Sequence, residues 1–385
     1  MTDLLTQTIH GLTFGTLIGL VAIGYTMVFG IIKLINFAHG EFYMVGGFSG
    51  LLALTVFCGE GRLLHTWSPE GKLLLALLCS ACFVGVLAVV TERLAYRPIR
   101  SAGKIAALLT AVGVSLLLQN LGIAVFGAKQ VAFPETIQNE HFPRLKVRLE
   151  DLRAGQNAGQ TIVYQAPIRD LDGNVITGAN GKPLGLMTET LVDAGQKIDQ
   201  DELVKAIAAS PLSVYAYPTV TVSKKQLVVF FALIVSAAAL YVLVQKTRMG
   251  RAMRAVSHDM QAASLMGIDC SKIVTITFAI GGALAGMGGV LAGGMFISTA
   301  DPMMGFMFGL KAFIAAVLGG IGNIPGALLG GLVLGLVEQF TQHYADGLLF
   351  KGASAYRDAI AFLILIIVLL VRPRGFFGRM GGEKV

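Results

Sequence analysis

The stretch that decides the fold runs from residue 9 to residue 31 and reads IHGLTFGTLIGLVAIGYTMVFGI. It contains no Asp, Glu, Lys or Arg, and a helix needs about 20 mostly apolar residues to cross the core of a bilayer. Gly11, Gly15 and Gly19 recur at every fourth position, which lines one helix face with small residues and permits close contact with a second helix. The segment therefore predicts a membrane-spanning helix inside a packed bundle.

The composition of the whole chain supports this prediction. Of the 385 residues, 55% are hydrophobic and 14% are charged, whereas a typical soluble domain has about 25% charged residues. The 48 glycines favour close packing of membrane helices. The formal net charge is +7, and the basic residues lie in a few loops. In these positions they indicate the orientation of the chain in the membrane rather than binding of nucleic acid. We expect an all-α polytopic membrane protein.

Outward from the first span, the same criterion predicts about nine transmembrane helices. The ninth has a short apolar part, so we expect that helix to extend outward through Arg357 and Asp358. The nine spans lie at roughly 9–31, 41–58, 72–91, 105–126, 226–245, 273–298, 304–321, 325–341 and 357–371.

Basic residues in three loops orient these spans, because Lys and Arg are enriched on the cytoplasmic side of membrane proteins. The alternation of nine spans puts the three loops on one side, so we predict an N-terminus outside and a C-terminus in the cytoplasm. The loops contain Arg93, Arg97, Arg100 and Lys104; Lys246, Arg248, Arg251 and Arg254; and Arg372, Arg374 and Arg379.

One long polar segment, residues 127–224, separates the N-terminal helices (1–126) from the C-terminal helices (225–385). It contains most of the prolines, and the alternation of spans places it outside the cytoplasm. Within it, 161–169 is typical of a strand, 172–174 of a turn and 199–209 of a short helix with an acidic start. We predict a small folded extracytoplasmic insert of mixed α/β character.

The predicted cytoplasmic loop at 246–272 contains a short amphipathic helix that ends at Gly267. A soluble partner could hold such a helix in a groove; the alternative is a helix that lies on the lipid headgroups. The chain contains no G-x-x-x-x-G-K-[ST] motif, so an ATPase that uses a P-loop would have to be another chain. The candidate residues for coupling to an ATPase are Met249, Gly250, Arg251, Ala252, Arg254, Asp259 and Gly267.

Asn36, His39 and Glu41 lie between the first two spans. Ionisable groups near the membrane core are costly and often functional, so these three are candidate translocation or gating residues. The alternative is a solvated cytoplasmic turn in which Asn36 and Glu41 cap the flanking helices.

Lys311 and Glu338 lie inside apolar spans that a tight turn near 323–326 joins. They stand about equally far from this turn, so an α-helical rise of about 1.5 Å per residue places them at similar depth. We predict an intramembrane ion pair, because an isolated charge at that depth would be costly. The alternative is that each side chain reaches the outer headgroups separately.

Catalytic and metal-binding motifs are absent from the sequence. The four cysteines and six histidines are scattered, and no group of residues combines a nucleophile with a base in a suitable context. We therefore predict neither enzymatic activity nor a bound metal or cofactor.

Short motifs spread along the chain outside the insert resemble those of a known family. They are AIGYTMVFGII at 22–32, INFAHGE at 35–41, AYRPIR at 95–100, RMGRA at 248–252, KAF at 311–313, VLGGIG at 317–322 and IPGA at 324–327. Together, and in this order, they resemble the LivH-type permeases of branched-chain amino acid ABC importers.

The resemblance implies a subunit of the cell inner (plasma) membrane that moves leucine, isoleucine and valine into the cytoplasm. It implies a LivM-type second permease subunit, two cytoplasmic ABC ATPase subunits and a periplasmic amino-acid-binding protein as partners. Related permeases carry urea or short amides, which leaves the substrate open, and the outer insert is longer than is usual in the family. A secondary transporter would need more ionisable residues in its spans for ion coupling.

Overall fold

The chain forms two compact units, one of residues 7–138 with 225–385 and one of residues 1–6 with 139–224. In the computed structural model, the described residues are 2–33, 36–59, 61–62, 64–100, 102–134, 141–142, 145–146, 160–167, 186–192, 215–218, 222–348, 352–372 and 375–377.

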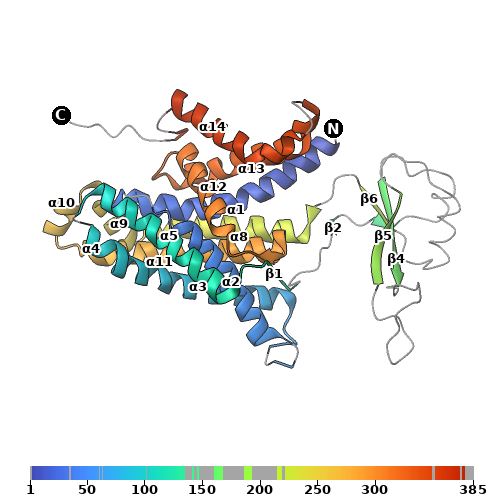
Figure 1. The fold of residues 1–385 in the computed structure, drawn as a ribbon, viewed down its shortest axis with the longest axis horizontal. Coiled ribbons are helices and arrows are strands. Elements are labelled where there is room, and N and C mark those ends of the chain that lie inside the picture. The colour runs from blue at the N-terminus through green and yellow to red at the C-terminus, as the bar shows by residue number, and fades with distance from the viewer. Residues whose placement is uncertain are drawn as a thin grey trace. The chain divides into compact units, whose positions relative to one another are not determined.

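The first unit is a bundle of helices (Figure 1). In the described part of the chain, seven helices are long and apolar enough to cross a membrane: α1 (Thr2–Ile32), α2 (His39–Cys58), α3 (Pro69–Thr91), α5 (Lys104–Phe126), α8 (Lys224–Lys246), α11 (Cys270–Leu291) and α13 (Ile324–Leu348). Two shorter apolar helices, α12 (Met304–Gly319) and α14 (Arg357–Val371), coincide with the seventh and ninth predicted spans. Every predicted span therefore coincides with a helix, and the last one begins at Arg357.

Shorter helical elements extend or connect the long ones. The chain continues from α3 through the π-helix η1 (Glu92–Tyr96) into α4 (Arg97–Ile99), and from α11 through the π-helix η2 (Ala292–Ile297). Helices α9 (Arg248–His258) and α10 (Met260–Leu265) lie between α8 and α11, and the 3₁₀ helix η3 (Ala353–Tyr356) precedes α14.

The glycine face of α1 packs against α13. A methyl group on Gly15 would come within 2.8 Å of the Gly331 carbonyl oxygen. Because only a hydrogen atom fits there, the two helix backbones approach closely. Gly46 of α2 and Gly286 of α11 form a second contact of this kind.

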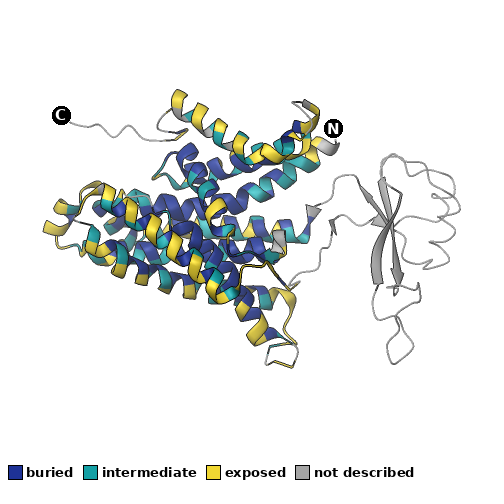
Figure 2. Ribbon diagram, in the orientation of Figure 1, coloured by how far each residue is buried: buried dark blue, intermediate teal, exposed yellow. Residues whose placement is uncertain are grey.

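The helices differ in how far their neighbours cover them. In the most apolar window of each helix, 83% of the residues of α1 are buried, against 22% in α5 and 17% in α8. Figure 2 shows the buried residues in the middle of the bundle and exposed residues along its outer helices. These outer helices expose large apolar side chains such as Leu78, Leu109 and Phe231, a surface that suits contact with lipid.

A short antiparallel pair joins the segment after α5 to the segment after α11. Strand β1 (Val131–Ala132) pairs with β8 (Thr299–Ala300), and the Phe133 backbone N–H donates to the Ser298 carbonyl oxygen at 2.8 Å. The helical unit therefore extends to residue 138, beyond the predicted boundary at residue 126.

The second unit contains a small antiparallel sheet in the order β3-β6-β4-β5. Its strands are β3 (Leu145–Lys146), β4 (Gln160–Pro167), β5 (Leu186–Val192) and β6 (Tyr215–Pro218), and β2 (His141–Phe142) pairs separately with β7 (Val222–Ser223). Strand β4 covers most of the strand predicted at 161–169. The turn predicted at 172–174 and the helix predicted at 199–209 lie outside the described residues.

Candidate functional site

Three charged residues from three helices meet inside the bundle. The Lys311 Nζ atom of α12 lies 2.8 Å from Glu338 Oε2 of α13 and 2.8 Å from Asp358 Oδ1 of α14. Lys311 is 8% exposed and Glu338 is 3% exposed. The structure therefore brings the two predicted residues together and adds Asp358 as a third; we call Lys311, Glu338 and Asp358 the charged cluster.

The turn between α12 and α13 explains how two of these residues meet. Gly320 and Gly322 have positive φ angles of 97° and 94°, which glycine adopts without steric cost, and the Asn323 Oδ1 atom accepts a hydrogen bond from the Gly326 N–H at 3.2 Å. Beyond the turn, Gly330 packs directly on the Ala315 backbone. The helices run antiparallel at close distance, so residues equally far from the turn face each other.

Asp358 is a residue that sequence reasoning placed in a helix but did not assign to the pair. It stands in the first turn of α14, which is not a neighbour of α12 along the chain. The available signal was its position in an otherwise apolar helix, because a carboxylate there calls for a cationic partner.

Asn36, His39 and Glu41 are 3%, 1% and 1% exposed, so the interpretation of this segment as a solvated turn is wrong. Asn36 and Glu41 do not cap the helix either, because Ala38 occupies the N-cap position of α2 and no side chain caps it. The backbone closes over the segment, since a methyl group on Gly40 would come within 2.8 Å of the Gly309 Cα atom of α12.

The buried segment forms a polar centre with residues from other helices. The Tyr96 hydroxyl donates to Asn36 Oδ1 at 2.5 Å, and the Ser115 hydroxyl donates to Glu41 Oε1 at 3.2 Å. The His39 ring packs edge-on against the Tyr25 ring, with centroids 4.5 Å apart. We call Asn36, His39, Glu41, Tyr96 and Ser115 the polar centre.

Much of the hydrogen-bonding capacity of the polar centre is unused. Both ring nitrogens of His39, the Asn36 Nδ2 atom and the Glu41 Oε2 atom are buried without a hydrogen-bond partner among the described residues. Buried polar atoms are almost always satisfied in folded proteins, so several unsatisfied ones at one place call for an explanation such as bound water or a second conformation.

Five of the predicted coupling residues lie on α9, Asp259 is the N-cap of α10, and Gly267 follows the end of α10. Asp259 divides the predicted single helix in two, because its Oδ1 atom accepts hydrogen bonds from the Gln261 and Ala262 backbone N–H groups at 2.8 and 3.0 Å and so caps α10. Gly267 has a φ of 83°, which suits the end of a helix.

The α9–α10 pair has one face against the bundle and one exposed face. Gly250 and Met253 are buried, whereas Arg251 and Asp259 are exposed. At the end of α10, Leu265 and Met266 are 89% and 83% exposed. Both side chains lie within the predicted amphipathic helix but were not among the predicted coupling residues, and they present an exposed apolar surface beside the charged residues.

Glu92 is a second buried residue that sequence reasoning did not select. Its Oε1 atom lies 2.8 Å from Arg100 Nη2, and its Oε2 atom accepts a hydrogen bond from the Thr275 hydroxyl at 2.8 Å. It therefore joins the end of α3 to α11. The π-helix η1, which carries both Glu92 and Tyr96, aims these two side chains into the bundle, and hydropathy alone does not predict such a π-helix.

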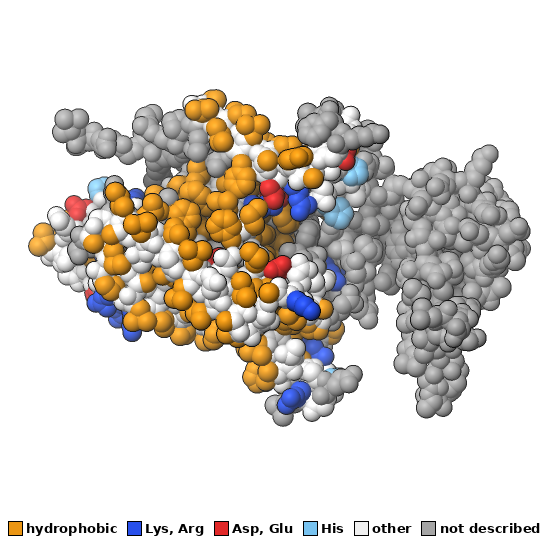
Figure 3. Space-filling view, viewed as in Figure 1, with side chains coloured by type: hydrophobic (Ala, Val, Ile, Leu, Met, Phe, Trp, Pro, Cys, Tyr) orange, Lys and Arg blue, Asp and Glu red, His pale blue; other side chains and the backbone are white. Residues whose placement is uncertain are grey.

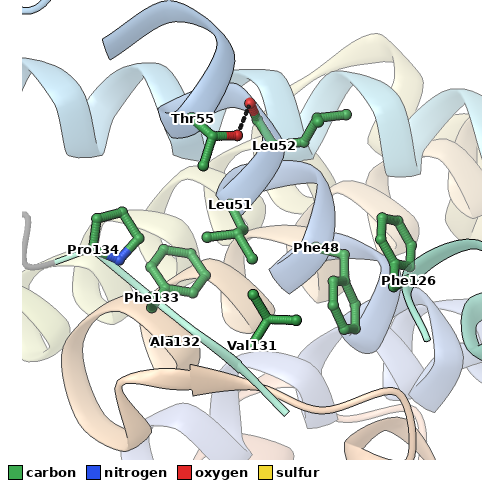
Figure 4. Close-up of a pocket in the computed structure, with 9 residues that line it drawn as sticks. All are labelled: Phe48, Leu51, Leu52, Thr55, Phe126, Val131, Ala132, Phe133 and Pro134. Atoms are coloured by element: carbon green, nitrogen blue, oxygen red, sulfur yellow. Dashed lines mark hydrogen bonds between the residues drawn. The ribbon is translucent and has the colours of Figure 1, made fainter. Parts of the chain in front are cut away.

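An open cavity of about 460 Å³ lies at the ends of α2 and α5 beside β1 (Figure 4). Its described lining is apolar except for Thr55, whose hydroxyl donates to the Leu52 carbonyl oxygen of its own helix at 3.0 Å. Phe48 and Phe126 stack there with ring centroids 4.2 Å apart. We call this the apolar groove; its lining suits a hydrocarbon chain rather than a charged solute.

Comparison with known proteins identifies the family. The family described as branched-chain amino acid transport system / permease component matches residues 7–369. The chain belongs to this permease family. The match runs from within α1 to within α14 and so includes seven described helices that are long and apolar enough to cross a membrane, which makes the permease a multi-pass membrane protein.

Individual relatives of the permease cover nearly the whole chain. It is 34% identical to the high-affinity branched-chain amino acid transport system permease protein LivH of Escherichia coli K12, over 99% of this chain and 97% of the relative. It is also 34% identical to the permease protein BraD of Pseudomonas aeruginosa, over 99% of this chain and 98% of the relative. The ribose import permease protein RbsC of Escherichia coli K12 is 36% identical over only 36% of this chain. No solved structure matches the permease significantly.

Proposed function

We propose that this permease is the membrane subunit through which an ABC importer of the inner membrane moves leucine, isoleucine and valine into the cytoplasm. The observation that carries the proposal is the identity of about one third to LivH and BraD over 99% of the chain. The match to the ribose permease covers only a part of the chain.

The test of this function is uptake. A strain that lacks this chain should lose high-affinity uptake of radiolabelled leucine, isoleucine and valine, and the restored gene should return it. If the deletion strain keeps leucine uptake and loses urea uptake, the substrate is urea or a short amide.

The proposed partners follow from what the chain lacks and from its relatives. Because the sequence has no P-loop motif, ATP hydrolysis would take place on two separate cytoplasmic ATPase subunits. A LivM-type permease subunit and a periplasmic binding protein complete the proposed importer. Affinity purification of the tagged permease should recover the second permease and both ATPases, and loaded binding protein should stimulate their ATPase activity.

The α9–α10 pair is the proposed contact with an ATPase. Its exposed Arg251 can meet carboxylates, and Leu265 with Met266 supplies the apolar anchor that stable interfaces need. Single cysteines at Leu265 and Met266 should crosslink to the ATPase. Crosslinks that form only from the 92–104 loop would place the contact on α4 instead.

The proposed orientation rests on the basic loops. Cysteines introduced near Arg97 and Arg251 should react with an impermeant reagent only from the cytoplasmic side. A cysteine at Lys72, before the apolar part of α3, should react only from outside, as should cysteines in the segment between α5 and α8. Labelling of Lys72→Cys from the cytoplasm would reverse the assignment.

The polar centre is the proposed gating element. Asn36, His39 and Glu41 are buried with unused hydrogen-bonding atoms, so a second arrangement of the helices or entry of water could satisfy them at little cost. A gating role means that substitutions here alter transport more than they alter folding.

A further inference from the structure

A cavity of about 420 Å³ opens beside the charged cluster, between α1, α2, α12, α13 and α14. Its size lies within the range of about 300–1,000 Å³ that is usual for small-molecule sites. Figure 3 shows basic and acidic atoms side by side at the edge of a hydrophobic hollow, over the part of the bundle where Figure 1 draws α12 and α13.

One side of this cavity is apolar. Its wall consists of Phe14, Tyr43, Met304, Met307 and Phe308. The Tyr43 and Phe308 rings stack with centroids 4.2 Å apart and an interplanar angle of 2°, which gives a flat surface. Aromatic rings and flexible methionines fit branched aliphatic groups of slightly different shape.

The other side of the cavity carries one accessible cation and one carboxylate oxygen that can accept a further hydrogen bond. The Arg357 side chain is 44% exposed; its Nη1 atom donates to the neutral Gln342 Oε1 atom at 2.8 Å, and its Nε atom lies 3.9 Å from Asp358 Oδ1. Glu338 also lines the cavity. Its Oε2 atom accepts from Lys311, whereas its Oε1 atom has no hydrogen-bond partner among the described residues.

We propose that this cavity binds a free zwitterionic amino acid with a branched apolar side chain during its passage through the permease. Arg357 holds the carboxylate, for which its planar guanidinium is suited, and Glu338 Oε1 accepts from the ammonium group. The aliphatic side chain lies on the wall formed by Tyr43, Phe308 and the two methionines. This inference rests on the proposed function and adds the place where the substrate binds.

Charge balance favours a zwitterion over other solutes. Lys311 and Arg357 together with Glu338 and Asp358 carry two positive and two negative formal charges, so the surroundings are neutral overall. A zwitterion leaves this balance unchanged, whereas a cationic or anionic amino acid would add an uncompensated charge in a poorly solvated site. Urea or a sugar would bring no charged group to Arg357 or to the Glu338 Oε1 atom, and no branched aliphatic group to the aromatic wall.

Photolabelling tests the site directly. The probe is a leucine analogue with a photoreactive diazirine in its side chain, applied to the purified permease–ATPase complex in nanodiscs without the binding protein, so that the binding protein does not select the ligand. Labelled peptides should come from α12 around Met304, Met307 and Phe308, and excess leucine should abolish the labelling. Labelling confined to other helices, insensitive to leucine, or absent at leucine concentrations that saturate uptake would overturn the site.

A matched pair of substitutions tests the apolar wall. Met307 lines the cavity and is 42% exposed, whereas Met303, four residues earlier and 61% exposed, is not among its lining residues. Met307→Trp should reduce labelling by about tenfold or more, as expected when a pocket loses room for a methyl-bearing side chain, and Met303→Trp should leave it unchanged. Equal labelling of both variants would contradict the assignment.

Arg357→Gln tests the carboxylate contact without a change in the wall. In the wild type, leucine should compete with the probe much better than leucinol, which lacks the carboxylate. In the variant, this preference should disappear, a result that a merely structural role of Arg357 would not produce; a retained preference would overturn the assignment. Leucine uptake by the complete importer is measured alongside: no uptake defeats the proposed function, whereas uptake with labelling elsewhere defeats only this site.

Discussion

The charged cluster and the polar centre both place polar side chains among apolar helices, but they satisfy them differently. In the charged cluster, one cation lies 2.8 Å from each of two carboxylates. In the polar centre, Glu41 accepts one hydrogen bond from Ser115, and neither nitrogen of His39 has a partner among the described residues. The charged cluster pairs charges across three helices and leaves Glu338 Oε1 without a hydrogen-bond partner among the described residues, whereas the polar centre leaves four of its buried polar atoms without one.

Burial of polar groups therefore has two different consequences in one bundle. Removal of one partner from a buried ion pair is costly because the remaining charge stays buried. Substitution of a group that already lacks partners removes fewer interactions, so it should change function more than stability.

Lys311→Met should have the largest effect on folding. It removes the shared partner of Glu338 and Asp358, so the free energy of unfolding should fall by about 3–5 kcal/mol. Chemical unfolding in detergent and the yield of monodisperse protein measure the loss. Lys129→Met, at an exposed position, serves as the control and should change stability by no more than about 0.5 kcal/mol.

A charge swap should restore only part of this loss. Lys311→Glu with Glu338→Lys recreates the pair but places the new carboxylate beside Asp358, so like charges meet. Addition of Asp358→Asn should improve the swapped protein, because it removes that repulsion. If the double variant is no more stable than the worse single variant, and Asp358→Asn does not help, the three residues do not act as one cluster.

Glu338→Gln should have an intermediate effect. Lys311 keeps Asp358 as a partner but loses its more buried carboxylate, so we expect a loss of about 1.5–3 kcal/mol, the range for hydrogen bonds to charged groups. The same unfolding assay measures it. A stability equal to that of the wild type would mean that Asp358 alone is enough to neutralise the buried charge of Lys311.

Tyr96→Phe should cost less than any change in the charged cluster. It removes the hydroxyl that donates to Asn36 Oδ1 and leaves the buried ring in place. Since the hydrogen bond is between uncharged groups, the expected loss is about 1 kcal/mol. Tyr241→Phe, on the exposed side of α8, is the matched control, and a difference between the two variants reports the Asn36 contact.

Glu41→Gln should change stability least. The glutamine keeps a carbonyl oxygen for the Ser115 hydroxyl, and no cation among the described residues loses a partner, so we expect a change below about 1 kcal/mol. Leucine uptake should nevertheless fall if the polar centre gates the permease. A loss of stability as large as that of Glu338→Gln would contradict the contrast between the two regions.

Particular residues show how far the sequence predicts this molecule. Apolar length alone placed every span on a helix, and the tight turn after Gly319 was enough to set Lys311 opposite Glu338. The glycine repeat in α1 predicted close packing, but its partner, Gly331 of α13, lies some 300 residues away in the chain. Asp358, Tyr96 and Glu92 were missed because each contacts a residue that is distant in sequence.

By itself, then, the sequence determined the membrane class, the helical spans and the one contact that a short turn controls. The physical reason is that a bilayer requires every backbone polar group to be satisfied within a helix, so the length of an apolar segment nearly dictates its structure. Tertiary structure decided which polar side chains are buried and which are paired. Asn36, His39 and Glu41 are hydrophilic residues beside a loop, and they are buried by neighbouring elements, among them α12 packed on Gly40, because burial depends on neighbouring helices rather than on local hydropathy.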